Sequence, residues 1–347
     1  MEKKVYLSYL RVLGVFALSI FLLVSFSTVT KAATIKLSYA FFAPSRSFPA
    51  VQMERWAKEV AKRTHGKVKV NTYPGGTLLG AKNMFDGVIS GVADIGCSCP
   101  PYMPGRFPLM EAVDLPVGFK NAKVASAVTW DLYKKYHPAS FSKLKVLTMF
   151  CCAPGNIMSR TPIKSLKDLN KIEIRGTGIS GIYLKAIGAT PVAMPMSSVP
   201  ESLQKGVIKG LISSLEVMKD FNFASLCRYV TLTNGPTTSF AVVMNKKKWN
   251  SLPADVKKVI EDLGDEQCQW TGKYEDDHVN DSLAWSKKKY NVKIYKLKAA
   301  EYKAIDSKVH FMVDNYLAKT KKAGLPGKAF LKDLYKLKAK YEKKFGN

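Results

Sequence analysis

Arg175 is the side chain whose type and setting point most directly to a chemical role. It ends a short apolar stretch, residues 172–175, and a glycine-rich segment, residues 176–181, follows it. A guanidinium group offers parallel N–H donors that match the two oxygens of a carboxylate, so the pairing sets orientation as well as affinity. The sequence therefore predicts that Arg175 holds a carboxylate. A salt bridge at the surface or between two parts of the fold is the alternative role.

The glycines after Arg175 have part of the spacing of a dinucleotide-binding loop. They are Gly176, Gly178 and Gly181. That motif also needs an acidic residue about 20 positions later, at the end of a strand, to bind the ribose. The sequence has no acidic residue in that setting, so we interpret the glycines as a tight strand-to-helix turn that lets a ligand approach the backbone.

The histidines argue against catalysis. The chain has four, His65, His137, His278 and His310, which stand at a helix end, in a turn and in two charged helical segments. A nucleophilic serine or cysteine needs a base beside it, and the sequence contains neither Gly-x-Ser-x-Gly nor His-Glu-x-x-His. We therefore expect no enzymatic activity, no metal and no cofactor. An exported hydrolase is the alternative from another class.

The cysteines do not form the framework of a disulfide-stapled protein. Cys97 and Cys99 are separated by one residue, and Cys151 and Cys152 are adjacent, which is too close for ordinary bridges within each pair. No Cys-x-x-Cys motif or neighbouring histidine suggests zinc. We interpret the six cysteines as buried thiols. One long-range disulfide is the alternative, because export compartments are oxidising.

The first 32 residues have the features of a secretory signal peptide. Basic residues precede a largely apolar run over residues 12–29, and Thr30-Lys31-Ala32 has the small-x-Ala pattern of a cleavage site. The most apolar part of this run is short for a membrane span of about 20 residues. We predict cleavage after Ala32 or Ala33 and a periplasmic location. A retained membrane anchor is the alternative.

The chain is strongly basic. Its formal net charge is +27, and +24 remains once residues 1–32 are removed. Such a charge raises the question of nucleic acid. However, the lysines alternate with apolar residues, as over residues 332–340, which indicates solvated amphipathic helices. We expect no nucleic-acid partner. A basic surface would attract anionic ligands, and more weakly anionic lipid or an acidic partner.

Strand and helix patterns alternate along the mature chain. Alternating polarity predicts strands over residues 34–40 and 67–73, and helical spacing predicts helices over residues 49–64 and 81–91. A short buried strand follows at residues 92–96. This order is typical of an α/β fold with an open parallel sheet and helices on both of its faces.

The pattern recurs after residue 150, which predicts a second lobe. Strands are expected over residues 172–175, 207–213 and 237–245, and residues 191–196 are expected to be extended. The chain passes between the lobes near residues 149–156 and again near residues 237–245. Two crossings predict a hinge with a ligand cleft beside it.

The expected division of the mature chain follows from these crossings. Lobe I takes residues 33–152 and 240–280, and lobe II takes residues 153–239 and 281–347, including the C-terminal helices. No proline interrupts residues 254–290. One long helix, or two abutting helices, could therefore brace both lobes.

From about residue 35 to 290 the chain resembles the solute-binding component of tripartite ATP-independent periplasmic (TRAP) transporters, of the dicarboxylate-binding-protein type. The resemblance implies a two-lobed periplasmic binding protein fold that closes at a hinge, a carboxylate ligand and delivery to an integral-membrane permease. The matching segments occur in the family's order. They are residues 91–96 (GVADIG), 102–108 (YMPGRFP), 114–116 (DLP), 162–169 (PIKSLKDL), 172–175 (IEIR), 188–194 (GATPVAM), 203–210 (LQKGVIKG) and 244–249 (MNKKKW).

The resemblance also suggests ligand-binding residues in lobe II. The family's arginine at the position of Arg175 pairs with the ligand carboxylate. Asn156 stands where a second basic or polar residue is frequent, and Ser213 where an asparagine often contacts the ligand. Ser214 is a further hydroxyl candidate. Met196 stands where an aromatic residue often covers the ligand, with plain core packing as the alternative.

Three aromatic residues are the candidates in lobe I. Phe41 and Phe42 follow the first expected strand, and Tyr102 lies in the loop after residues 96–99. Loops at strand ends face the cleft in open α/β sheets, although packing under a loop is the alternative for each.

Aromatics, a methionine and serines, in place of charges, predict a monocarboxylate ligand. A 2-oxo, 2-hydroxy or aromatic acid fits better than a dicarboxylate. We expect a monomer that serves a TRAP permease, with service to a sensor as the alternative.

Overall fold

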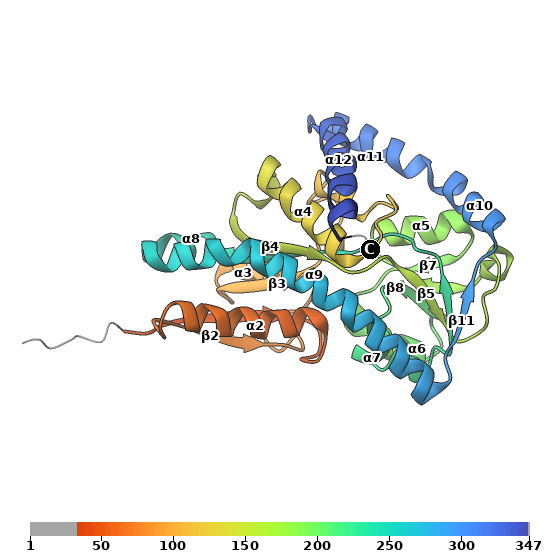
Figure 1. Cartoon of the computed structure of the whole chain (residues 1–347), viewed down its shortest axis with the longest axis horizontal. Helices are drawn as coiled ribbons and strands as arrows, with labels where there is room; N and C mark the ends of the chain where they lie inside the picture. The colour runs from red at the N-terminus through yellow and green to blue at the C-terminus, as the bar shows by residue number, and fades with distance from the viewer. Residues whose placement is uncertain (1–32, 346–347) are drawn as a thin grey trace, which may run out of the picture. The chain divides into compact units, whose positions relative to one another are not determined.

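The structure is a computed structural model that describes residues 33–345, and from Ile35 onward the chain forms one compact unit. The predicted signal peptide, residues 1–32, lies outside the described residues. Two sheets make up the unit (Figure 1). The first sheet contains β1 (Ile35–Phe41), β2 (Val68–Tyr73), β3 (Ile95–Ser98), β4 (Leu144–Cys151) and β10 (Ser239–Asn245). The second contains β5 (Asn156–Ser159), β6 (Glu173–Arg175), β7 (Thr190–Val192), β8 (Gly210–Ser213), β9 (Tyr229–Leu232) and β11 (Lys293–Lys296).

The strand orders confirm the predicted two-lobed α/β fold. They are β2-β1-β3-β10-β4 in lobe I and β11-β9-β5-β8-β6-β7 in lobe II. Helices cover the sheets: α2 (Phe48–Arg63), α3 (Met84–Ser90), α4 (Ala122–Tyr136), α5 (Ile179–Ile187), α6 (Val199–Gln204), α7 (Val217–Asp220), α8 (Lys246–Ser251), α9 (Ala254–Tyr290), α10 (Ala299–Val309), α11 (Phe311–Lys322) and α12 (Gly327–Phe345). Helix α2 illustrates the local rules. Pro49 stands in its first turn, where no backbone donor is needed, and Gly66 turns the chain beyond its end at a φ of +78°.

The sheets are mixed, whereas the sequence predicted parallel sheets. Strand β10 runs antiparallel to both β3 and β4, and β5 runs antiparallel to β8 and β9. The two crossings explain the difference. A chain that leaves one sheet at the carboxyl edge of its strands enters the other sheet at the facing edge. The first strand after each crossing therefore runs in the opposite direction to its neighbours.

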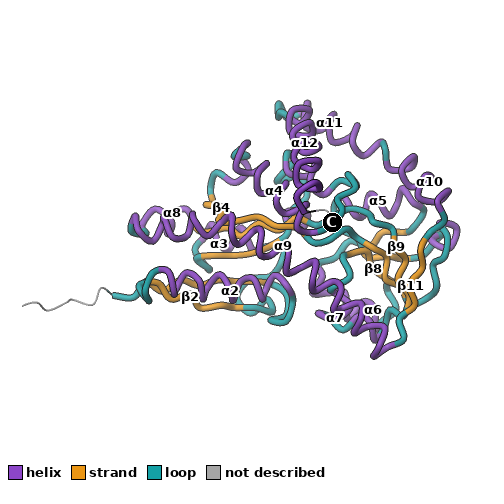
Figure 2. Tube along the Cα trace, viewed as in Figure 1, coloured by secondary structure: helices purple, strands orange, loops and turns teal. Residues whose placement is uncertain are grey.

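Helix α9 is the single long helix that the absence of proline allowed. Its 37 residues correspond to about 55 Å. Figure 2 shows it passing from α2 to α7, and both helices pack against it. In lobe I, Asp276 accepts the backbone N–H of Ala122 (2.7 Å). In lobe II, Ser282 Oγ donates to the carbonyl of Leu215 (2.9 Å). No described helix is both long enough and apolar enough to cross a bilayer.

The C-terminal helices α11 and α12 pack on lobe I, although the expected division assigned residues 281–347 to lobe II. Tyr316 Oη donates to the carbonyl of Leu109 (3.1 Å). Tyr341 Oη donates to Asp131 of α4 (2.6 Å). Within residues 281–347, the end of α9, β11 and α10 join lobe II: Ser282 bonds Leu215, β11 extends the sheet beside β9, and α10 packs on α5. The amphipathic pattern predicted these helices but carried no signal for the lobe they cover.

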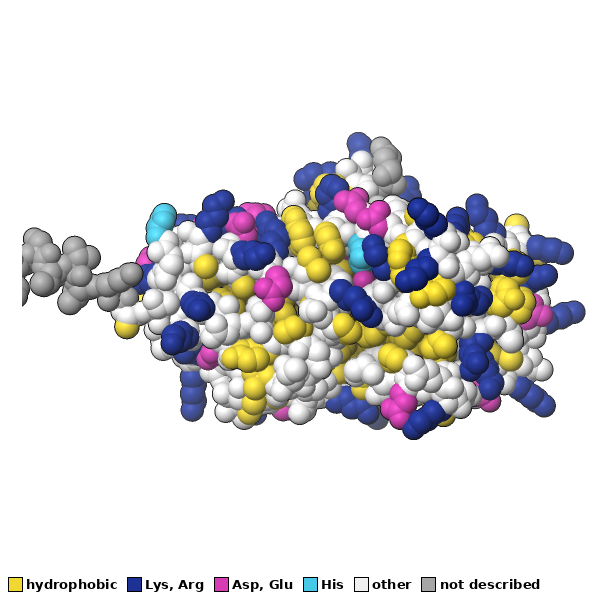
Figure 3. Space-filling view, turned by 90° about the horizontal axis from the view of Figure 1, so that it is seen from below, with side chains coloured by type: hydrophobic (Ala, Val, Ile, Leu, Met, Phe, Trp, Pro, Cys, Tyr) yellow, Lys and Arg dark blue, Asp and Glu magenta, His cyan; other side chains and the backbone are white. Residues whose placement is uncertain are grey.

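Charged side chains are spread over the surface. Figure 3 shows Lys and Arg side chains scattered over the face in view, with apolar side chains between them. This distribution agrees with the interpretation of the lysines as a solvated surface.

Gly264 lets α9 approach the first sheet closely. A Cβ at this position would lie 2.8 Å from the carbonyl oxygen of Leu147 in β4. Alanine would gain about 1 kcal/mol in helix propensity but would force the helix and strand apart, at about 1–3 kcal/mol. We therefore expect Gly264→Ala to lower the free energy of unfolding by on the order of 1 kcal/mol. Denaturant unfolding measures this, with Asp281→Ala on the exposed face of α9 as control. An increase in stability would contradict the close approach.

Asp114 anchors the start of β10 from inside lobe I. Its carboxylate accepts the backbone N–H of Ser239 (2.7 Å) and lies 3.2 Å from Ser239 Oγ. Burial raises the pKa of Asp114 to about 7 from an ordinary value of 3.8, although the bonds from Ser239 oppose the rise. The folded chain therefore binds a proton that the unfolded chain has lost, so the stability contribution of this group falls as pH rises from about 4 to 7.

Asp114→Asn should remove this pH dependence, because an amide can accept from the N–H of Ser239 and donate to its hydroxyl. We expect the stability of the variant relative to the parent to increase as pH rises from about 4 to 8. Denaturant unfolding across that range, with the exposed Asp281→Asn as control, measures it. Parallel stability curves for variant and parent would show that Asp114 does not titrate in this way.

Candidate functional site

The carboxyl ends of four strands converge on one cavity. Phe41 ends β1, Cys99 follows β3, Arg175 ends β6 and Ser213 ends β8. Such edges are where ligands bind in α/β folds. The cavity encloses about 460 Å³, including its mouth, and both lobes line it. Its walls comprise Phe41, Phe42, Ala43, Ser47, Phe48, Pro49, Cys99, Tyr102, Cys152, Arg175, Met196, Ser213, Glu216, Val217, Asp220, Phe221, Thr238 and Phe240.

Arg175 is a buried cation with neutral neighbours. Only 4% of its surface is exposed, and among residues 33–345 no acidic side chain lies within salt-bridge distance of it. Its Nε donates to the carbonyl of Met194 (3.0 Å), and its Nη2 donates to Tyr102 Oη (3.2 Å). Its Nη1 makes no hydrogen bond to any described residue. Since an unpaired buried charge is costly, this arrangement suits an anion in the cavity better than the salt bridge considered above.

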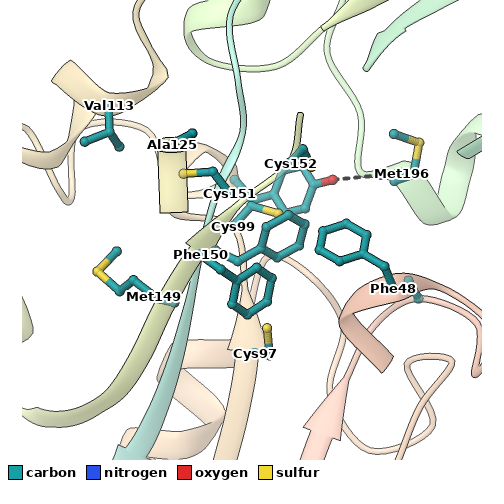
Figure 4. Packing of buried hydrophobic residues seen from close by; sticks show 14 of the residues in the cluster. Phe48, Cys97, Cys99, Val113, Ala125, Met149, Phe150, Cys151, Cys152 and Met196 are labelled. Atoms are coloured by element: carbon teal, nitrogen blue, oxygen red, sulfur yellow. Dashed lines mark hydrogen bonds between the residues drawn. The ribbon is translucent and has the colours of Figure 1, made fainter. Parts of the chain in front are cut away.

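Tyr102 joins the two lobes at the arginine. Its hydroxyl accepts from Arg175 Nη2 and also from the backbone N–H of Met196 (3.2 Å), the bond drawn dashed in Figure 4. Burial raises the pKa of Tyr102 to about 12, and the charge of Arg175 opposes the rise. The residue is therefore a neutral phenol at physiological pH, and it connects lobe I to the cationic wall of lobe II.

Aromatic rings form most of the wall on the side of lobe I. The ring centroids of Phe42 and Tyr102 are 5.5 Å apart, and those of Phe48 and Phe240 are 5.7 Å apart, both pairs edge-to-face. Figure 4 shows Phe48 beside Phe150, and their ring centroids are 5.8 Å apart in a further edge-to-face pair. Rings placed in this way offer a flat apolar body both area and favourable ring geometry.

The structure brings six of the eight predicted site residues to the cavity: Phe41, Phe42, Tyr102, Arg175, Met196 and Ser213. The other two lie elsewhere. Asn156 lines a separate hollow, and its Oδ1 accepts the backbone N–H groups of Thr233 and Asn234 (3.0 and 3.1 Å). It therefore fastens the two crossing segments together. Ser214 is buried behind the wall, within hydrogen-bonding distance of Glu216 and Glu275.

Glu216 and Asp220 line the cavity without having been selected from the sequence. Glu216 is 2% exposed, and burial raises its pKa, with a further rise caused by Asp220. Asp220 Oδ1 lies 2.6 Å from His278 Nε2, and Asp220 raises the pKa of that histidine. Asp220 also bonds lobe I, through the backbone N–H of Phe48 (3.1 Å) and through Arg46. The sequence did contain a signal for Glu216, because it is an acidic residue shortly after an expected strand, where side chains face the cleft.

The six cysteines are all buried free thiols in the structure. Cys99 and Cys152 line the cavity. Cys152, Glu216 and Glu275 have possible metal-ligand atoms within 4.8 Å of one another. Burial raises the pKa of all three groups. A metal ion could bind here only by displacing protons from these groups.

The chain matches the family model described as bacterial extracellular solute-binding protein, family 7, over residues 40–320. A TRAP periplasmic solute-binding protein from Desulfovibrio salexigens, in an open complex, is 54% identical, with a TM-score of 0.80 and coverage of 89% of this chain and 97% of that chain. A TRAP solute-binding protein from Rhodoferax ferrireducens, with copurified benzoate, is 26% identical, with a TM-score of 0.85 and coverage of 89% and 99%.

Among curated relatives, the C4-dicarboxylate-binding periplasmic protein DctP of Rhodobacter capsulatus is 27% identical over 260 residues, or 72% of this chain and 77% of that protein. The family match spans most of the chain, and the lobes, the cleft and the convergent strand ends agree with it. The chain therefore belongs to family 7 of the bacterial extracellular solute-binding proteins and is a TRAP solute-binding protein.

Proposed function

We propose that this protein captures a small organic acid in the periplasm and delivers it to the membrane subunits of a TRAP permease. The ligand carboxylate binds Arg175, and the lobes close around the rest of the molecule. The observation that carries this proposal is the guanidinium group itself, which is 4% exposed and lacks an acidic partner among the described residues. The family supports the second half, because TRAP solute-binding proteins work with membrane permease components.

The chemistry of the walls favours an aromatic monocarboxylate. Arg175 is the single Lys or Arg among the residues that line the cavity. Glu216 and Asp220 also line it, so a second carboxylate on the ligand would meet acids instead of a cation. Phe42, Phe48 and the other rings suit a flat apolar body. Relatives bind different acids: one carries benzoate, and another is a C4-dicarboxylate-binding protein. The acidic wall favours the benzoate type of ligand for this chain.

Closure is part of the proposed function, because both lobes contribute to the clamp. Tyr102 of lobe I bonds Arg175 and the backbone of Met196 in lobe II. Asp220 of lobe II bonds Phe48 of lobe I. These contacts surround the cavity, so a ligand inside it would be held by the same groups that hold the lobes together.

Arg175→Ala should weaken ligand binding strongly, because it removes the cation that faces the carboxylate. Loss of a desolvated charge partner is worth about 2–5 kcal/mol, which corresponds to roughly 30-fold to several-thousand-fold in affinity. Calorimetry with benzoate measures this on the mature chain. The control is Arg63→Ala, which removes a half-buried arginine at the end of α2 that pairs with Glu59 and Glu266 and does not line the cavity. A benzoate affinity that survives Arg175→Ala unchanged would remove Arg175 from the site.

A thermal-shift screen of organic acids should separate monocarboxylates from dicarboxylates. A ligand at about 100 times its dissociation constant adds about 2.7 kcal/mol of stability. We expect benzoate, phenylacetate and mandelate to give larger shifts than succinate or malate at equal concentration. The reverse order, with succinate or malate binding far more tightly than any monocarboxylate, would contradict the proposed ligand class.

A further inference from the structure

The proposed clamp does not use a group of buried carboxyls that lies in and behind the cavity wall. Glu216 lies three residues beyond Ser213, the end of β8, and lines the cavity. Glu275 of α9 lies behind it and is fully buried. Ser214 Oγ is 3.0 Å from Glu275 Oε1 and also contacts Glu216 Oε2. The carboxylate-binding residue and this acidic group thus belong to one cavity.

Hydrogen-bond counting indicates that the group shares a proton. Ser214 has one hydroxyl proton but contacts two carboxyl groups, so it can donate to only one of them. The second contact is a hydrogen bond only if that carboxyl carries a proton of its own. Glu275 Oε2 has no hydrogen-bond partner among the described residues although it is sealed from solvent. Burial, and then the neighbouring Glu216, raise the pKa of Glu275 well above its usual range. Glu275 is therefore the protonated member and Glu216 the acceptor.

The surrounding charges leave Glu216 with acceptor capacity. Asp220 is fully engaged, since Oδ1 meets His278 and Oδ2 accepts the N–H of Phe48. Cys152 faces the two glutamates as a neutral thiol, because burial raises its pKa. Glu216 Oε2 accepts from Ser214, and the carboxyl groups of Glu216 and Glu275 are close enough to share a side-chain hydrogen bond. A carboxylate has about four acceptor sites, so these two contacts leave Glu216 able to accept from a ligand in the cavity that it lines.

We propose that Glu216, supported by Ser214 and Glu275, accepts a hydrogen bond from a donor group on the part of the ligand remote from its carboxylate. The donor is a hydroxyl or an ammonium group. This inference rests on the proposed function, since it takes the carboxylate to be at Arg175. It narrows the ligand to an aromatic acid that carries such a substituent. A second carboxylate lacks a donor when ionised, and it would face Glu216 and Asp220 as a like charge.

Matched benzoates test this inference on the mature chain by calorimetry. The probes are 3-methylbenzoate, 3-(hydroxymethyl)benzoate, 3-(aminomethyl)benzoate and isophthalate, with the corresponding para isomers. Of the hydroxymethyl and aminomethyl probes, we expect the tighter binder to exceed the affinity of the methylbenzoate with the same ring position by at least about tenfold. A hydrogen bond to a charged group usually increases affinity by this much. Comparison of the hydroxymethyl and aminomethyl probes distinguishes a neutral donor from a cationic one. Isophthalate and terephthalate should bind more weakly than the methyl compounds.

Variants of Glu216 test whether this residue causes the higher affinity of the donor-bearing probes. The quantity compared is the ratio of donor-bearing to methyl affinities within each variant. We expect Glu216→Leu to reduce both ratios to about one, and Glu216→Gln to reduce chiefly the aminomethyl ratio, because the amide keeps an acceptor but loses the charge. Glu201→Gln, an exposed glutamate on α6 that pairs with Lys205, is the control and should keep the parent ratios.

The outcomes separate this inference from the proposed function. Suppose that the ratios are near one in the parent protein and that methylbenzoate binding is lost in Arg175→Ala. This result would overturn the role of Glu216 but would still support the binding of the carboxylate by Arg175. The parent ratios decide this even where a variant fails to fold. Ratios that survive Glu216→Leu, or that disappear when a chelator removes divalent metal, would also overturn it. Failure of every probe to bind would overturn both proposals.

Discussion

The buried positive charge of Arg175 is the constraint around which the rest of the site is arranged. A guanidinium group at 4% exposure has lost most of its hydration, and neutral oxygens of Met194 and Tyr102 replace only part of it. Such a site has a strong preference for an anion. No acidic side chain of the described residues pairs with Arg175. A ligand carboxylate therefore has no internal carboxylate to compete with.

The fold supplies the rigidity that this arrangement needs. The two crossings reverse one strand in each sheet and so bring the carboxyl edges of both sheets to one cleft. Helix α9 ties the lobes together and contributes Glu275 and His278 directly behind the cavity wall. The acids are therefore held by a helix that both lobes share. Arg175 and the acids Glu216 and Asp220 line different parts of the cavity wall. The two ends of a ligand would therefore meet opposite charges, which would fix its orientation.

Much of this architecture could be predicted from the sequence, and the limits have physical causes. Alternating polarity predicted β1 and β2, and the lack of proline predicted α9. Arg175 beside its glycine-rich turn indicated where the cleft binds a ligand. The antiparallel insertion of β10 could not be predicted from periodicity, because strand direction depends on where the chain crosses. Asn156 and Ser214 were selected by position, yet their side chains are engaged with backbone and buried carboxyl groups. Glu216 and Glu275 are 59 positions apart, and only tertiary packing reveals that they share a site.

The most direct measurement of the central claim is a crystal structure of the protein with benzoate bound. We predict that both carboxylate oxygens lie within hydrogen-bonding distance of the Arg175 guanidinium group, one of them on Nη1, and that the ring lies among Phe42, Phe48 and Phe240. A benzoate bound with its carboxylate away from Arg175, while the guanidinium group keeps only its protein partners (Met194, Tyr102 and, at 3.5 Å from Nη2, Thr177 Oγ1), would contradict the account.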